Sequence, residues 1–165
     1  MDNLDEDRSV SNAVTELDVF INRPVGEVWN QFIDFGSWVT SHRIEEIHGR
    51  RGTIGSIFRA SFKNSAEEGY PLPHHHYCKI IKVIPEQLYV LKTYSEKGGS
   101  YGVHIVAFDE ARFVSKDGGT LLTFKLFAEF SGERIAQNPG AINMDASQDG
   151  MVKNLNNLKR IVESH

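Results

Sequence analysis

The strongest constraint in this sequence is a long series of strand patterns followed by a single helical stripe. Residues 54–63 alternate apolar and polar side chains, and strand-like segments recur at 74–84, 88–95, 101–115 and 120–131. Short turns rich in Gly, Pro and Asp connect most of these segments, so neighbouring strands are predicted to be antiparallel. Shorter strands are predicted at 13–22 and 44–48.

Three helical segments complete the pattern. Pro24 suits a first helical turn, and apolar residues then recur at steps of three and four as far as Ile33. After a break at 34–37, a second short helical segment is predicted from Trp38 to about His42. The C-terminal stripe is one face of a long helix and consists of Met144, Gln148, Met151, Leu155, Leu158 and Val162. An antiparallel sheet must cover that stripe, so the predicted fold class is α+β.

The charge distribution separates a tail from a nearly neutral body. Residues 1–12 are acidic and polar and are expected to form a disordered tail before a single domain over 13–165. Residues 1–8 hold four acidic residues and one basic residue, which supply −3 of the net charge of −4. The remainder has 17 basic against 18 acidic residues and no basic stripe, so nucleic acid is not expected as a partner.

The sequence also bears on the compartment. It has no leader pattern and no apolar run as long as a membrane span needs, so neither secretion nor membrane insertion is expected. The single cysteine, Cys78, cannot form an internal disulfide. These features together predict a cytoplasmic protein, and both a monomer and a homodimer are compatible with them.

Four segments carry a resemblance to a known family. They are INRPVGEVW at 21–29, DFGSW at 34–38, DGGT at 117–120 and LKRIVE at 158–163. Their order and spacing resemble the START-like superfamily, also called Bet v 1-like or SRPBCC, with the polyketide cyclase/dehydrase-like branch as the nearest group. The resemblance spans nearly the whole chain.

This resemblance implies a helix-grip fold, in which a curved antiparallel sheet of about seven strands surrounds a long C-terminal helix and two short helices follow the first strand. It also implies a hydrophobic cavity between sheet and helix that takes lipids, polyketides or other apolar molecules. It implies no particular reaction, because the superfamily contains binders, transfer proteins, cyclases and co-chaperone modules. No cofactor is expected.

The three adjacent histidines at 74–76 raise the question of a metal site. His74, His76 and Cys78 share one face of an extended strand, with neighbouring side chains roughly 6.5–7 Å apart. Imidazole and thiolate bind zinc, and His104 could complete a site from another strand. The spacing His-x-His-x-Cys is not a known pattern for structural zinc, so no metal is expected.

Histidine also suggests acid–base chemistry, because it titrates near neutral pH. His104 shares a face with Val106 and Phe108 and is predicted to point into the cavity, with His76 as the second candidate. Tyr94 or Arg59 would orient an oxyanion. The alternatives are a core histidine paired with a backbone carbonyl, an outward-facing Arg59, and a Tyr94 whose hydroxyl lies in water.

The residues predicted to contact a ligand are the inward aromatic positions of the strands, some polar neighbours and the helix stripe. They are Trp38, Phe58, Arg59, Phe62, His74, Phe108, Phe124, Met144, Gln148 and Met151. Arg50 and Arg51 either guard a cavity mouth or form a solvated pair in a loop.

Three functions follow from these observations. The first is binding of a small hydrophobic or aromatic molecule in the internal cavity. The second is a cyclase, dehydratase or isomerase that acts on a polyketide-like or aromatic substrate through histidine acid–base catalysis. The third is a protein-interaction module, which needs an exposed apolar patch on the outside of the sheet.

Overall fold

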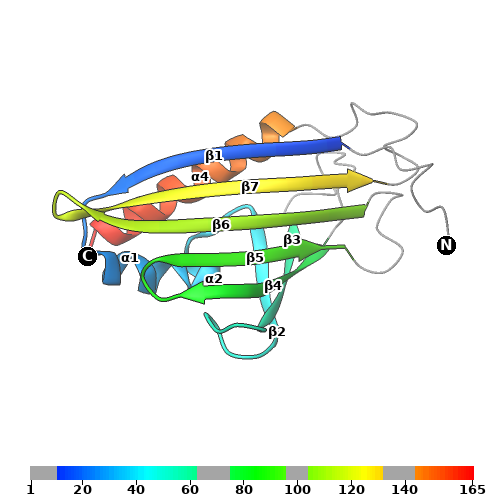
Figure 1. Cartoon of the computed structure of the whole chain (residues 1–165), viewed down its shortest axis with the longest axis horizontal. Helices are drawn as coiled ribbons and strands as arrows, with labels where there is room; N and C mark the ends of the chain where they lie inside the picture. The colour runs from blue at the N-terminus through cyan, green and yellow to red at the C-terminus, as the bar shows by residue number, and fades with distance from the viewer. Residues whose placement is uncertain (1–10, 63–74, 96–103, 132–143) are drawn as a thin grey trace.

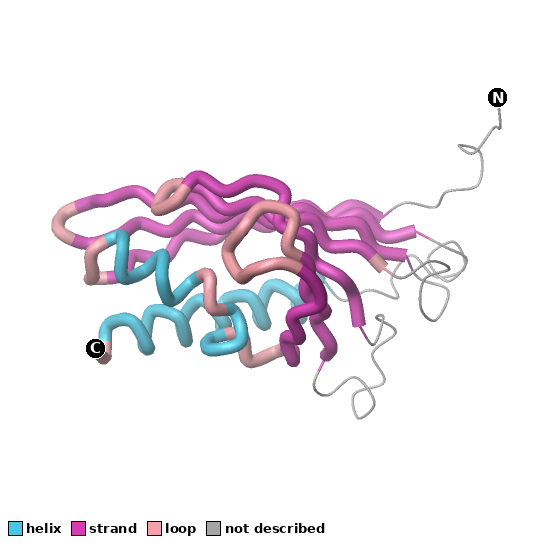
Figure 2. The backbone as a smooth tube through the Cα atoms, turned by 90° about the horizontal axis from the view of Figure 1, so that it is seen from below, coloured by secondary structure: helices cyan, strands magenta, loops and turns pink. Residues whose placement is uncertain are grey.

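In the part of the chain that the structure describes, seven antiparallel strands form one sheet, and three helices lie on one side of it (Figures 1 and 2). The computed structural model describes residues 11–62, 75–95, 104–131 and 144–165. The strands are β1 (Ser11–Ile21), β2 (His42–His48), β3 (Ile57–Phe62), β4 (His75–Ile84), β5 (Leu88–Tyr94), β6 (His104–Lys116) and β7 (Gly119–Ser131). The helices are α1 (Val25–Phe32), α2 (Phe35–Trp38) and α4 (Met144–Glu163). Within the sheet the strand order is β1-β7-β6-β5-β4-β3-β2.

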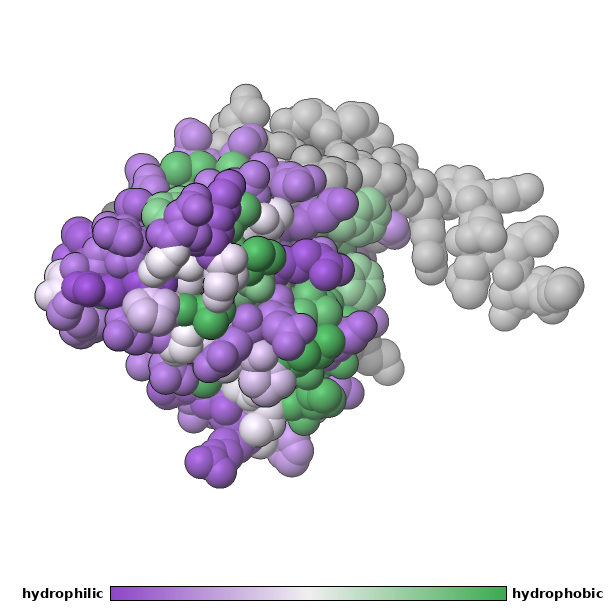
Figure 3. All heavy atoms as spheres, turned by 60° about the vertical axis from the view of Figure 1, so that its left-hand side comes forward, coloured by the Kyte–Doolittle hydropathy of each residue, from purple (hydrophilic) through white to green (hydrophobic). Residues whose placement is uncertain are grey.

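The two faces of the sheet differ in burial. On β7, Leu122 and Phe124 are buried, whereas Lys125 and Phe127 on the other face are exposed. We call the buried face, on which the helices lie, the concave face, and the opposite one the convex face (Figure 2). Because side chains alternate along a strand, the cross-strand register assigns nearly every strand residue to one face. Polar residues dominate the side of the molecule shown in Figure 3, with smaller apolar patches between them.

Helix α4 covers the concave face along β1. Its buried residues Leu155, Leu158 and Val162 recur at steps of three and four and therefore lie on one side of the helix. They join the same core cluster as Ile21 of β1 and Leu122 of β7. The predicted C-terminal stripe is thus confirmed from Leu155 onward.

Helices α1 and α2 add a group of aromatic rings to one end of this core. Phe32 stacks on Trp38 with ring centroids 5.4 Å apart, and Trp29 meets Phe113 of β6 edge to face at 5.1 Å. The indole nitrogen of Trp38 donates a hydrogen bond to the carbonyl oxygen of Phe32 at 2.9 Å. These contacts close the core at the end of the sheet where β6 turns into β7.

A tight turn connects β6 to β7 at this end of the sheet. Lys116 pairs with Gly119, so only Asp117 and Gly118 form the connection. Both have positive φ, 49° and 78°, as a two-residue hairpin turn of type I′ requires. A Cβ atom on Gly119 would lie 2.7 Å from the carbonyl oxygen of Ile21, so the close approach of β1 requires glycine there.

The predicted fold class and element order are confirmed, with differences at boundaries. The first strand begins at Ser11 rather than residue 13, because Ser11 and Asn12 pair with β7. The second helical segment is α2 at Phe35–Trp38, and the prediction that it runs to His42 is wrong because β2 begins at His42. Residues 1–10 of the tail predicted over 1–12 lie outside the described residues.

Asn154 connects α4 to the segment between α2 and β2. Its side-chain oxygen accepts hydrogen bonds from the backbone nitrogen and the hydroxyl of Thr40, at 2.9 and 3.1 Å. Its side-chain nitrogen donates to the Ser41 hydroxyl at 2.9 Å. Asn154 is only 4% exposed, so this amide holds the wall of the concave interior against the helix.

Asn154→Ala is expected to lower the free energy of unfolding by about 1–2 kcal/mol, because it removes the hydrogen bonds that the buried Asn154 amide makes to Thr40 and Ser41. Urea unfolding measures this change. Asn156→Ala serves as the matched control because Asn156 is exposed on the same helix. An equal effect of both substitutions would contradict this role of Asn154.

Candidate functional site

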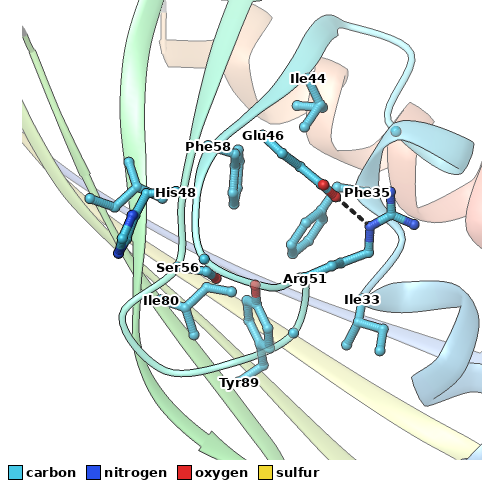
Figure 4. Close-up of a pocket in the computed structure, with 14 residues that line it drawn as sticks. Ile33, Phe35, Ile44, Glu46, His48, Arg51, Ser56, Phe58, Ile80 and Tyr89 are labelled. Carbon is cyan, nitrogen blue, oxygen red and sulfur yellow. Dashed lines mark hydrogen bonds and ion pairs between the residues drawn. The ribbon is translucent and has the colours of Figure 1, made fainter.

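A pocket with a volume of about 290 Å³ lies at the concave side of β2 to β5, under the joint between α1 and α2 (Figure 4). Apolar and polar groups contribute nearly equally to its accessible wall. The lining residues are Ile33, Phe35, Gly36, Ile44, Glu46, His48, Gly49, Arg51, Gly52, Ser56, Ile57, Phe58, Ile80 and Tyr89. This volume and this mixture are typical of small-molecule sites.

The loop between β2 and β3 forms one side of the pocket. Gly49 has φ 79°, and a Cβ atom there would lie 2.9 Å from Ser56, so glycine allows the loop to fold back on itself. Gly55 donates a backbone hydrogen bond to the Ile80 carbonyl oxygen at 2.8 Å, and Ile80 donates to that of Ser56 at 3.0 Å. The loop is therefore fixed to β4.

Arg51 connects this loop to two other walls of the pocket. Its guanidinium forms ion pairs of 2.8 Å with Asp34, between α1 and α2, and with Glu46 on β2. The Arg51 side chain is 50% exposed, so each pair contributes little to stability. Arg51 therefore lies at the mouth of the pocket, which is one of the two positions predicted from the sequence.

Tyr89 forms the floor of the pocket. Its ring packs edge to face against Phe32 and Phe35, with centroid distances of 5.4 Å for both. The hydroxyl points toward the middle of the pocket, between Ser56 and Phe35 in Figure 4. It is buried and has no hydrogen-bond partner among the described residues. Burial, followed by the nearby Cys78 and Asp109, raises the pKa of this phenol far above its usual range.

Asp109 lies one diagonal step from Tyr89 on the same concave face, because Tyr89 pairs with Ala111. Its Oδ1 atom is buried and lacks a hydrogen-bond partner among the described residues. Desolvation raises the pKa of this carboxyl from 3.8 to about 7. The residue nevertheless keeps part of its surface accessible. Asp109 thus lies on the concave face next to Tyr89, although it is not one of the residues that line the pocket.

Cys78 and Thr93 are neighbours on the same face, with Sγ and Oγ1 3.4 Å apart. Burial raises the pKa of the Cys78 thiol to about 12. The thiolate that acts as a nucleophile is therefore not populated near neutral pH.

The concave face also carries two histidines at its β2–β4 side. The rings of His42 and His76 meet edge to face, with centroids 5.3 Å apart, and Nδ1 of His42 lies 2.7 Å from the Ser41 hydroxyl. His76 has the same parity on β4 as the buried Cys78 and Ile80, so its predicted inward direction agrees with the register. A catalytic role for His76 stays a prediction.

The structure places four of the predicted site residues on the convex face. Phe108 is 39% exposed, and His104 has the same parity on β6, whereas the intervening Ala107 and Ala111 are buried. The prediction of which β6 residues face inward is therefore wrong by one position, and the residues of the opposite parity face inward. Tyr94 stacks on Tyr77 on this outer side at 5.8 Å. Arg59 forms an ion pair with Glu45 there, so neither residue is placed to orient an oxyanion in the interior.

The other predicted ligand contacts divide into core, pocket and surface positions. Phe58 lines the pocket, whereas Trp38 and Phe124 are buried in the core, 3% and 5% exposed. Met151 is partly buried against that core. Gln148 is exposed, which contradicts its inward assignment. His74 and the side chains of Phe62 and Met144 lie outside the described residues.

Two further findings concern metals and membranes. Among the side chains that the structure describes, no three His, Cys, Asp or Glu residues lie close enough to hold a metal ion. In the same part of the chain, no helix is long and apolar enough to cross a membrane.

Asp109 and Tyr89 were missed by the sequence interpretation, although a signal for them exists. Phe113, Ala111 and Ala107 form an apolar series on β6 with the same parity as Asp109. Aligning that series with Phe124 and Leu122 of the next strand would have placed Asp109 inside. To place Tyr89 at the pocket, one must know of the bulge in β4, which shifts the register between Ile80 and Lys82.

Comparisons with known proteins identify the fold. No family model and no curated protein match the chain. An uncharacterized protein from Rhizobium leguminosarum is similar in structure, with a TM-score of 0.71 and 15% identity over 96% of this chain and 99% of that one. Ara h 8.0201 matches with a TM-score of 0.63 and 15% identity over 94% and 100% of the two chains.

Norcoclaurine synthase from Thalictrum flavum, solved in complex with dopamine and hydroxybenzaldehyde, matches with a TM-score of 0.60 and 19% identity over 95% of this chain and 90% of that one. The chain therefore has a Bet v 1-like helix-grip fold. At these identities the likeness shows the fold alone, and the site must be argued from the residues.

Asp109→Asn is expected to change how stability depends on pH. The folded protein holds the proton of Asp109 up to about pH 7, whereas the unfolded chain releases it near pH 3.8. Ionisation of the buried carboxyl thus destabilises the wild type progressively between these values, by an amount on the order of a few kcal/mol. The variant lacks this loss, so its stability relative to wild type rises from pH 4 to pH 7.

Urea unfolding at a series of pH values measures this difference. Asp18→Asn is the matched control, because Asp18 is exposed on the outer face of β1. Parallel stability curves for Asp109→Asn and wild type would contradict the buried, desolvated position of Asp109.

Proposed function

We propose that this protein binds a small, largely apolar or aromatic molecule in the concave interior, in and beside the pocket above Tyr89. The observation that carries the proposal is a buried phenol hydroxyl, without a hydrogen-bond partner among the described residues, at the floor of a pocket lined by aromatic, aliphatic and polar side chains. A buried polar group without a hydrogen bond destabilises the free protein. A ligand with a hydroxyl, carbonyl or amine group supplies the missing hydrogen bond, while its apolar part contacts Phe35 and Phe58.

Two features support the size and type of this ligand. The pocket volume of about 290 Å³ suits a molecule of one or two rings. The aromatic walls offer edge-to-face and stacked contacts to a flat ring. The fold is shared with norcoclaurine synthase, whose complex contains two small aromatic molecules, and this likeness is consistent with the proposal without naming the ligand.

Tyr89→Phe is expected to weaken ligand binding about tenfold, because the ligand loses one buried hydrogen bond. The folded protein should keep or gain stability, since the substitution removes an unpartnered hydroxyl. Displacement of the neutral dye N-phenylnaphthylamine by naphthylmethanol, followed by fluorescence, measures the affinity.

Tyr94→Phe is the matched control, because Tyr94 stacks on Tyr77 on the convex face. Binding should be unchanged in that variant. Equal affinities of Tyr89→Phe and wild type, or a loss in Tyr94→Phe alone, would contradict a site above Tyr89.

A second candidate is a cyclase, dehydratase or isomerase of the polyketide cyclase/dehydrase-like kind that works in the same interior. The observation that favours it is a carboxyl on the concave face whose pKa is about 7, suited to accept and return a proton. Asp109 takes the role that the sequence interpretation gave to His104, and His76 is the second group on this face.

Turnover of any substrate found for this second candidate should fall by about a hundredfold or more in Asp109→Asn and stay unchanged in His104→Ala. The measurement is product formation by chromatography. Activity that survives in Asp109→Asn would remove the acid–base role from this carboxyl.

A further inference from the structure

Asp109 is an acidic group in a largely apolar environment, and none of the described residues supplies a counter-charge to it. It lies directly opposite Leu91 on β5 and Leu126 on β7. Phe124 and Ala128, on the same face of β7, are buried. Desolvation raises its pKa, and among the described residues no hydrogen bond and no neighbouring charge compensates the carboxylate.

The groups that face this carboxyl are neutral or distant in register. The neutral groups on this face are Tyr89 and Thr93 of β5 and Cys78 of β4. The histidines, His42 and His76, belong to β2 and β4, and Glu46 is tied to Arg51 at the pocket. The residues of α4 that pack into the hydrophobic core, among them Met151 and Leu155, are apolar. Every described lysine and arginine is exposed or partly exposed, and none reaches Asp109 as a partner.

We infer that Asp109 anchors the ligand and makes the interior selective for an aromatic or apolar molecule that carries a protonated amine. This inference rests on the proposed function and specifies its ligand. A cationic amine supplies the positive charge that the fold does not provide, and its N–H groups donate to the unpartnered Oδ1 atom.

The charge of Asp109 decides between ligands of equal shape. An alcohol forms a single hydrogen bond with the carboxyl and leaves its charge uncompensated. A carboxylate ligand would place a second negative charge beside Asp109 in a desolvated site and is disfavoured. The amine is the one of these three headgroups that gains from ionisation of Asp109.

The experiment compares three ligands with the same ring system: naphthylmethylamine, naphthylmethanol and naphthoate. Each displaces N-phenylnaphthylamine, whose own binding reports whether the interior accepts an apolar molecule at all. In wild-type protein at about pH 8.5, where Asp109 is ionised and the amine is still largely protonated, the amine should bind about tenfold more tightly than the alcohol. Naphthoate should bind most weakly.

Asp109→Asn should remove the preference for the amine and leave binding of the dye and the alcohol nearly unchanged. Asp18→Asn, with the same substitution at an exposed position of β1, should keep the preference. Within the wild type, the ratio of alcohol to amine dissociation constants should rise as pH increases through about 7, where Asp109 ionises. This pH series tests the inference without any variant.

The outcomes separate the two proposals. If the dye binds but the amine has no advantage, or if the advantage persists in Asp109→Asn, the role of Asp109 is wrong and the binding site above Tyr89 stands. If neither the dye nor any of the three ligands binds, the proposed function fails and the inference fails with it.

Discussion

The packing of α4 on the concave face of the sheet is the contact on which the rest of the structure depends. The buried side chains Leu155, Leu158 and Val162 need an apolar surface, and β1 and β7 provide it with Ile21 and Leu122. Once that face is fixed, the alternation of each strand decides which residues lie inside. A shift of one residue on β6 exchanges Phe108 for Asp109 and therefore changes the chemistry of the interior completely.

The interior changes in character along this face. At the end next to the β6–β7 turn, aromatic and aliphatic side chains fill the space, and Phe32, Phe113 and Leu122 are almost fully buried. Near the start of β5 the fold keeps a pocket above Tyr89, and the buried Tyr89 hydroxyl and Asp109 Oδ1 have no hydrogen-bond partner among the described residues. Such atoms lower stability unless a partner arrives, so their presence beside a pocket is the physical argument for a bound molecule.

Much of the fold could be predicted from the sequence, because periodic patterns over long segments report burial directly. The strands from β4 to β7 and the helix α4 are confirmed with small boundary changes, and the segments at 21–29 and 34–38 point to the correct fold. The site was harder to predict. The apolar residues Val106 and Phe108 lie on the convex face, and a strand with apolar residues on both faces does not show its parity. Tyr89 becomes part of a pocket only through the bulge in β4 and the loop anchored to it.

The most direct test of this account is a crystal structure of the protein grown with naphthylmethylamine. The account predicts electron density for the ring between the concave face and the helices, next to Tyr89, with the nitrogen within hydrogen-bond distance of Asp109. An empty interior, or a ring bound only on the convex face near Phe108, would contradict it.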